Sequence, residues 1–172
     1  MSSEPVVVIS ALTYTPRTDE FDLFVRMQQE NFNNQSVRPF LLDLMTLLSR
    51  KPVFLLDNWS AHIKAVEILE DDGKVEVWED ENNEDDENEA GSEEAADETA
   101  PDGAVVYFPT YAPELNPAEY VWSQSKYAEL ANYTPKTTDV LQRRVGQSLL
   151  GISDDQKLLR EFVKYSGLEL GL

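Results

Sequence analysis

Residues 54–62 read FLLDNWSAH, and residues 108–123 read FPTYAPELNPAEYVWS. Each stretch starts at the end of an apolar run typical of a buried strand and continues into residues that can begin a helix. A helical crossover between two such strands implies that they run parallel. Ligands tend to bind beyond the carboxyl ends of parallel strands, and Asp57 lies at such an end. These two stretches therefore define both the fold and a candidate site.

The upstream part of the chain predicts a hairpin, a helix and a strand. Residues 6–13 and 21–27 are two apolar runs separated by a turn, as in a β-hairpin. Residues 36–48 carry apolar side chains at every third or fourth position, which predicts an amphipathic helix capped by Ser36. Residues 53–56 form an unbroken apolar run, which is typical of a strand covered on both faces.

The downstream part of the chain alternates helices and strands. Ser60 opens a short helix, a small strand is expected at 75–78, and the next strand is expected at 105–108. Further helices are expected at residues 116–127, 137–149 and 154–165. This order predicts a single α/β domain over residues 1–172, with a mixed sheet flanked by helices.

The charge of the chain is concentrated in one segment. Of the 33 acidic residues, 17 lie between Glu70 and Asp102, where Lys74 is the only basic residue. Residues 70–103 are therefore expected to form an acidic, low-complexity, disordered insertion before the last core strand, because they cannot offset their ordering entropy by burial. The formal net charge of -19 argues against nucleic-acid binding, but the remainder of the chain is close to neutral.

Composition excludes several other classes of protein. The chain has no cysteine, so neither a disulfide framework nor a thiolate metal site is possible. The first apolar run follows no cationic segment and is too short for a signal sequence, and no later run reaches membrane-spanning length. We expect a cytoplasmic protein without a membrane partner, associated with the nucleoid if it is bacterial.

Together the two quoted stretches resemble the signature blocks of mariner-like DDE transposases and the related bacterial insertion-sequence enzymes. In that family a strand ends in Asp-Asn-x-x-x-His, and a later strand leads to Pro-x-Tyr-Ser-Pro-x-Leu-Asn-Pro-x-Glu-x-x-Trp. This chain has Ala112 where the family usually has Ser, and Thr110 where a second Pro is common. The resemblance covers roughly residues 6–132, and the second block is long and unusual, which makes it a specific match.

The resemblance implies a ribonuclease-H-like fold and a DNA-cleaving site for transposition and recombination of a mobile element. In the family, three carboxylates hold two divalent metal ions, Mg²⁺ or Mn²⁺, which prefer carboxylate oxygens. Two metal ions stabilise the attacking and leaving oxygens of a displacement at phosphate. By match of motif, Asp57 is the second carboxylate and Glu119 the third, both as catalytic residues and as metal ligands. The expected DNA partner is the transposon end, with His62 and Lys126 as candidate contacts.

The chain also differs from the family pattern. The family's first strand and first catalytic Asp would precede residue 6, and neither Asp19 nor Asp22 fills that role from a hairpin. The spacing from Asp57 to Glu119 is wider than usual because of the acidic insertion. We therefore expect a truncated DDE domain with little or no strand transfer alone, unless the missing segment is supplied either by a separately encoded N-terminal piece or by frameshifted translation. The alternative is a non-catalytic remnant that binds DNA or protein; whether the chain itself is an enzyme stays open.

Structural interpretations of the same residues remain open as well. Asp57 and Ser60 are common helix caps, and residues 116–119 make an ordinary helix start with Asn as cap, Pro at the first position and Glu closing a capping box. A histidine in the position of His62 more often packs or hydrogen-bonds than coordinates a metal ion, and Lys126 fits a solvated helix face equally well. The acidic insertion is most simply a solvating segment; a sharper hypothesis is that it repels DNA or occupies the metal-binding cleft.

Overall fold

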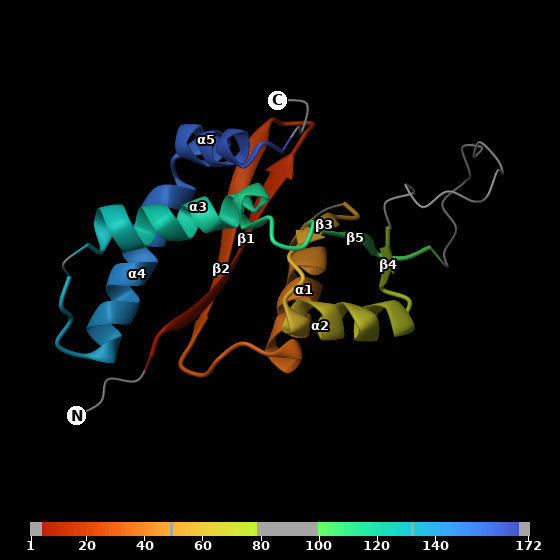
Figure 1. Ribbon diagram of the computed structural model, residues 1–172, viewed down its shortest axis with the longest axis horizontal. Coiled ribbons are helices and arrows are strands. Elements are labelled where there is room, and N and C mark those ends of the chain that lie inside the picture. Colours follow the sequence, from red (N-terminus) through yellow and green to blue (C-terminus); the bar gives the residue numbers. More distant parts are fainter. Residues whose placement is uncertain (1–4, 49, 79–99, 132, 169–172) are drawn as a thin grey trace. The chain divides into compact units, whose positions relative to one another are not determined.

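The computed structural model describes residues 5–48, 50–78, 100–131 and 133–168 (Figure 1). The chain divides into two compact units. We call Met1–Phe32 with Thr110–Leu172 the hairpin unit, and Asn33–Pro109 the parallel-sheet unit. Each unit has its own strands, helices and buried side chains, and each is described by itself.

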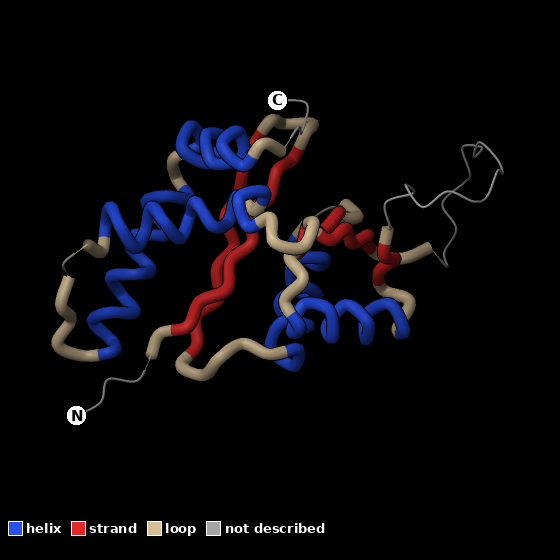
Figure 2. The backbone as a smooth tube through the Cα atoms, viewed as in Figure 1, coloured by secondary structure: helices blue, strands red, loops and turns tan. Residues whose placement is uncertain are grey.

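The hairpin unit begins with two long strands, which lie side by side in Figure 2. Strand β1 (Val7–Thr15) pairs antiparallel with β2 (Glu20–Gln28), and the register runs from Val7 opposite Gln28 to Thr15 opposite Glu20. Asp19 closes the turn in a left-handed conformation, with φ of 57°. The predicted hairpin is confirmed, with both strands slightly longer than expected.

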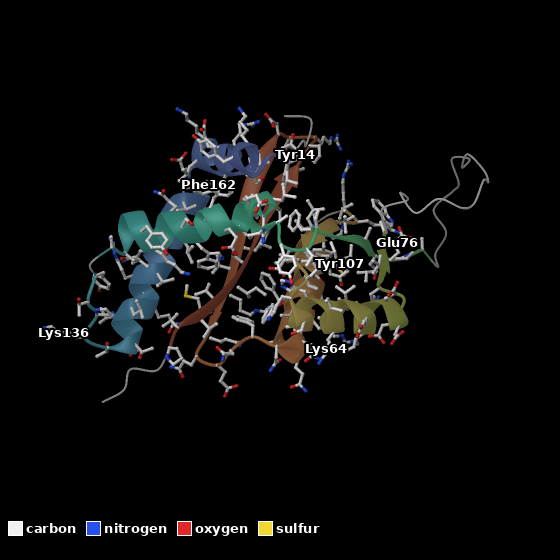
Figure 3. All side chains as sticks on the ribbon, viewed as in Figure 1. Tyr14, Lys64, Glu76, Tyr107, Lys136 and Phe162 are labelled. Carbon is white, nitrogen blue, oxygen red and sulfur yellow. The ribbon has the colours of Figure 1, made fainter. Side chains whose placement is uncertain are left out.

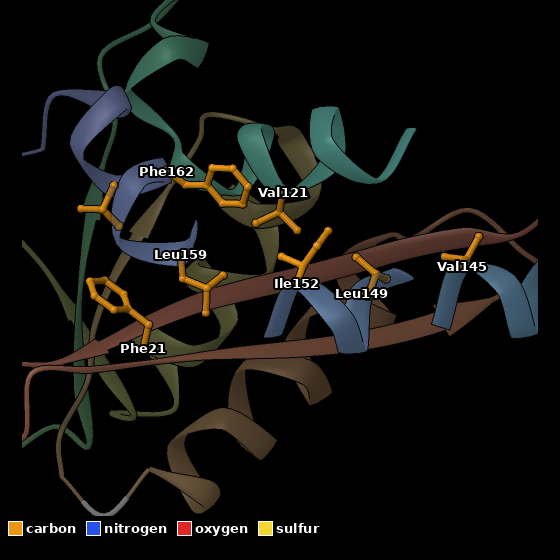
Figure 4. Packing of buried hydrophobic residues seen from close by; sticks show 8 residues of the cluster. Phe21, Val121, Val145, Leu149, Ile152, Leu159 and Phe162 are labelled. Carbon is orange, nitrogen blue, oxygen red and sulfur yellow. The ribbon is translucent and has the colours of Figure 1, made fainter. Parts of the chain in front are cut away.

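The helices of the hairpin unit follow the second quoted stretch. They are α3 (Pro117–Ser123), which continues as one π-helical segment (Gln124–Glu129), α4 (Thr138–Ser153) and α5 (Gln156–Ser166). Their apolar faces and β2 enclose the core shown in Figure 4. Its buried residues are Phe21, Val121, Val145, Leu149, Ile152, Leu159, Phe162 and Val163. The three helical patterns are confirmed, although the first is not a continuous α-helix.

The parallel-sheet unit contains three short strands in the order β3-β5-β4. Both β3 (Val53–Leu56) and β4 (Val75–Val77) pair parallel with the central strand β5 (Gly103–Tyr107). The predicted parallel crossover is therefore confirmed. The α/β architecture is also as expected, with the antiparallel and parallel pairings divided between two sheets in the described residues.

Two helices complete the parallel-sheet unit, α1 (Asn34–Leu47) and α2 (Ser60–Asp71), and they pack against each other. Helix α2 also lies close to the end of β5. Burial raises the pKa of the Tyr107 phenol (labelled in Figure 3), and the negative charges of Glu67 and Glu70 on α2 add to this shift. The last turns of α2, which carry Glu67 and Glu70, therefore lie near the Tyr107 side chain at the end of β5.

Two local expectations are wrong. The cap of α1 is Asn33, whose side chain accepts hydrogen bonds from the backbone N–H groups of Gln35 and Ser36. The Ser36 hydroxyl oxygen in turn accepts from the Asn33 N–H, which completes a capping box. Strand β3 is not covered on both faces, because Val53 and Leu55 are exposed while Phe54 is buried. An unbroken apolar run does not distinguish these two cases.

The acidic insertion is described only at its two ends. Its first residues finish α2 and form β4, as expected for a small strand at 75–78, and Lys74 Nζ lies 2.8 Å from Asp102 Oδ2 across the base of the insertion. Residues 79–99, on which the prediction of disorder falls, lie outside the described residues. Among the helices that the structure describes, none has both the length and the apolar character needed to cross a bilayer.

Candidate metal site at the end of strand β3

Asp57 follows β3 directly, and the ladder of the parallel sheet holds its backbone. The Phe108 N–H donates to the Leu56 carbonyl oxygen over 2.8 Å, next to the Leu56–Tyr107 pair of the β3–β5 register. The Asn58 side chain then donates from Nδ2 to the Phe108 carbonyl oxygen over 2.7 Å. The segment from the end of β3 to the start of α2 is therefore tied to the end of the neighbouring strand.

The Asp57 carboxylate receives two hydrogen bonds on the same oxygen atom. His62 Nδ1 lies 2.6 Å from Asp57 Oδ1, and the Trp59 backbone N–H donates to that oxygen over 3.2 Å. The Trp59 and His62 rings meet edge to face, with centroids 5.1 Å apart and planes at 83°. The His62 side chain is 15% exposed and the Asp57 side chain 49% exposed. The carboxylate is thus fixed at one oxygen and accessible to solvent.

These contacts keep Asp57 ionised. The hydrogen bond from His62 lowers the pKa of the Asp57 carboxyl below its ordinary value; partial burial opposes this shift, and the charge of His62 and the Trp59 N–H add to it. An ionised carboxylate only accepts hydrogen bonds, so the proton in the 2.6 Å contact belongs to His62 Nδ1. A half-exposed, anionic oxygen donor is the kind of ligand that Mg²⁺ and Mn²⁺ prefer.

The capping interpretation of Asp57 and Ser60 does not describe this helix start. The N-cap of α2 is Trp59, which makes no side-chain capping bond, and Ser60 is the first helical residue. The Asp57 side chain accepts hydrogen bonds from the backbone N–H of the N-cap residue, Trp59, and from the imidazole of His62, in the first turn of α2. The Asp57 side chain is therefore directed to His62 instead of serving as the N-cap of the helix.

Glu119 lies on a different unit, at the start of α3. The Asn116 side chain caps this helix by accepting from the Ala118 N–H over 3.0 Å, and Pro117 occupies the first position, so this part of the structural interpretation is confirmed. A capping box would need the Asn116 N–H, but that group donates to the Pro113 carbonyl oxygen over 3.0 Å. The exposed Glu119 side chain is therefore not needed to satisfy the cap.

Asp57 and Glu119 are thus described separately, one on each unit. Among the residues that the structure describes, no group of three or more His, Asp or Glu side chains is arranged to hold a metal ion. Each carboxylate taken singly has the chemistry and the exposure expected of a ligand to a hard divalent cation.

The remaining candidate residues lie in the hairpin unit, either on its surface, against its core or in an ion pair. Lys126 is exposed on the π-helical segment, and Tyr120 and Trp122 are partly buried against the core of the hairpin unit. Asp19 is held by Arg160, whose Nη2 lies 2.8 Å from its Oδ2, and by the Tyr14 hydroxyl at 3.2 Å. This engagement agrees with the expectation that Asp19 does not serve as the first catalytic carboxylate.

Sequence reasoning missed the contacts around Asp57. It allowed His62 to pack, to hydrogen-bond or to contact DNA but named no partner for it, and it assigned no role to Asn58 or to the Trp59 backbone. The available signal was spacing: a histidine five residues after a strand-terminal aspartate lies in the first turn of the following helix, from which its ring can reach back to the carboxylate.

Comparison with known proteins identifies a family. The sequence profile of the family described as DDE superfamily endonuclease matches residues 6–142, which include both quoted stretches and both candidate carboxylates. Among curated proteins and among solved structures there is no significant match. The family match spans most of the chain, from β1 into α4, and the chain therefore belongs to the DDE superfamily endonuclease family.

Proposed function

We propose that this chain is a transposase-derived nuclease-like domain that acts on DNA phosphodiesters, with Asp57 and Glu119 as metal ligands. The observation that supports this function best is the state of Asp57. It is an ionised, half-exposed carboxylate fixed at the carboxyl end of a parallel strand, in a chain of the DDE endonuclease family. That is where ligands of α/β sheets tend to bind.

The residues of the chain would bind the metal ions and hold the DNA backbone beside them. Asp57 and Glu119 would each contribute carboxylate oxygens to Mg²⁺ or Mn²⁺. When bound, such ions supply charge stabilisation to the attacking and leaving oxygens at a phosphodiester. Lys126, and His62 through its second ring nitrogen, would contact the DNA backbone near the transposon end.

We further propose that the site is completed by a third carboxylate from another segment, such as a separately encoded N-terminal piece, and that the present chain has little activity by itself. The alternative is a non-catalytic remnant that binds DNA or protein. The observation in its favour is that Asp19 is already engaged by Arg160 and Tyr14 and is not available as the third ligand.

A local metal titration tests the assignment of Asp57. Bulk Mn²⁺ affinity would be dominated by the acidic insertion, so the readout is paramagnetic broadening of the backbone amide signals of residues 57–59 in the full chain. We expect broadening in the wild type, and we expect Asp57→Asn to require about tenfold more Mn²⁺ for the same effect, because a charged ligand is lost.

The matched control is Glu67→Gln, which removes an exposed carboxylate from α2 of the same unit. This variant should behave like the wild type at residues 57–59. If Asp57→Asn and the wild type broaden alike, Asp57 is not a metal ligand, and the function must be assigned without a metal site at this position.

A further inference from the structure

Within the described contacts of the Asp57 carboxylate, one oxygen receives both hydrogen bonds. Oδ1 accepts from His62 Nδ1 and from the Trp59 N–H, at 2.6 and 3.2 Å. A carboxylate ligand to Mg²⁺ or Mn²⁺ needs only one oxygen for the metal ion. If Oδ1 is occupied by protein donors, the metal-binding oxygen is Oδ2.

The contact between His62 and Asp57 is strong and well supported. A distance of 2.6 Å lies at the short end for hydrogen bonds, as expected when the acceptor is ionised. The ring of His62 is mostly buried and packs edge to face against the Trp59 ring. Its helix is anchored by Ala61, Ala65 and Val66, which are buried. His62 is thus held in place by its own helix as well as by Asp57.

This contact requires a proton on His62 Nδ1, which the neutral Nδ1–H tautomer and the imidazolium both carry. The carboxylate accepts, so His62 carries a proton on Nδ1, and its Nε2 is directed away from Asp57. A histidine that merely filled space between Trp59 and the helix would need no proton on Nδ1. The proton on Nδ1 therefore distinguishes a packing role from a role directed at the carboxylate.

We propose that His62 is a positioning residue, which holds Asp57 Oδ1 through its Nδ1–H so that Oδ2 is presented to the metal ion. This inference rests on the proposed function and adds a residue that acts on the metal through Asp57. Partners in the second shell of a metal site orient the ligands, and their loss typically weakens metal affinity by about 10- to 100-fold.

Three forms of the full chain test this proposal: the wild type, His62→Phe and His62→Asn. Phe keeps a ring beside Trp59 but has no donor, whereas Asn places an amide N–H close to the position of Nδ1. The first measurement needs only the wild type. Because His62 is the only histidine, its two ring nitrogens can be assigned by ¹⁵N NMR without overlap. We expect the proton on Nδ1 and a hydrogen-bonded shift.

The second measurement is Mn²⁺ broadening of the amide signals of residues 57–59. We expect His62→Phe to need about tenfold more Mn²⁺ than the wild type, and His62→Asn to recover most of that loss. Unchanged amide dispersion of α2 and β3 in both variants shows that the fold is retained. If His62→Phe does not fold, the comparison of His62→Asn with the wild type and the tautomer measurement still test the proposal.

The outcomes separate this proposal from the proposed function. If Asp57→Asn weakens the local Mn²⁺ effect but His62→Phe does not, His62 has no positioning role and Asp57 remains a ligand. If the His62→Phe and His62→Asn variants lose local Mn²⁺ binding equally, or if Nδ1 carries no proton, the Nδ1–H donor is not responsible and the proposal fails. If Asp57→Asn is indistinguishable from the wild type, the metal assignment fails and the positioning role fails with it.

Discussion

Asp57 and Asp19 both have a lowered pKa, but for different structural reasons. His62 holds Asp57 at the end of a strand and leaves the carboxylate half exposed, whereas Arg160 and Tyr14 hold Asp19 in the turn of the hairpin. A perturbed carboxyl group is therefore not by itself a sign of a functional site, since structural ion pairs lower pKa values in the same way. The location of Asp57, at a parallel strand end in a DDE family chain, is what distinguishes it.

The hairpin turn should be sensitive to acid through Asp19. The hydrogen bond from Arg160 lowers the pKa of the Asp19 carboxyl, with partial desolvation opposing it. Because the folded pKa lies below the ordinary value of 3.8, this contact contributes its full stability above that ordinary value and loses it as the pH falls through the lowered pKa of the folded state. The difference in urea midpoint between the wild type and Asp19→Asn should therefore shrink with acid.

The matched control for this prediction is Asp22→Asn, which changes an exposed carboxylate on β2, three residues away. At neutral pH the urea midpoint of Asp22→Asn should lie closer to that of the wild type than the midpoint of Asp19→Asn does. A difference between the wild type and Asp19→Asn that stays constant from pH 7 to pH 2 would show that the ion pair does not contribute.

Among the elements, α3 shows how far periodicity can predict a helix. The apolar spacing of residues 116–127 predicted one helix, but the structure changes to a π-helical segment at Gln124–Glu129. Ser125 on this segment is buried, and its hydroxyl lies 2.8 Å from that of Ser148 on α4. A buried hydroxyl needs such a partner. Because the partner of Ser125 belongs to another helix, the local apolar pattern could not predict this contact.

One side chain of helix α5, that of Gln156, makes hydrogen bonds to both backbone groups of Phe21 on β2. Gln156 Oε1 accepts from the Phe21 N–H over 2.9 Å, and Gln156 Nε2 donates to the Phe21 carbonyl oxygen over 2.7 Å. Gln156→Ala should lower the free energy of unfolding by about 1–3 kcal/mol, because two partly buried backbone groups lose their partner. Chemical denaturation at pH 7 measures this change.

Gln142→Ala is the control for the loss of a glutamine from a helix, since Gln142 is exposed on α4. It should change stability by less than about 0.5 kcal/mol. Equal effects of the two substitutions would mean that the contacts of Gln156 with Phe21 do not stabilise the attachment of α5.

At the scale of the whole molecule, the charge of the chain is uneven. Deleting residues 80–97 removes ten carboxylates and no basic residue. If the acidic insertion repels DNA, the deletion should tighten binding to a duplex, and the gain should be larger at low salt than at high salt because screening weakens the repulsion. Fluorescence anisotropy at two salt concentrations measures both quantities.

A chain in which residues 80–97 are replaced by a neutral Gly/Ser segment of equal length separates charge from length. It should bind DNA like the deletion variant. Unchanged DNA affinity at low salt in both variants would remove the hypothesis that the insertion restrains DNA binding.

The sequence by itself determined the elements and the family. The hairpin, the parallel strands at 53–56 and 105–108, and the C-terminal helices follow from local apolar patterns, and the two quoted stretches identified the DDE family. Only the tertiary structure decided the contacts between separate elements, such as the Ser125 hydroxyl with that of Ser148, and the Gln156 side chain with the backbone of Phe21, which lies 135 residues away. The physical reason is that periodicity arises from contacts along a helix or strand, whereas these hydrogen bonds depend on how separate elements pack.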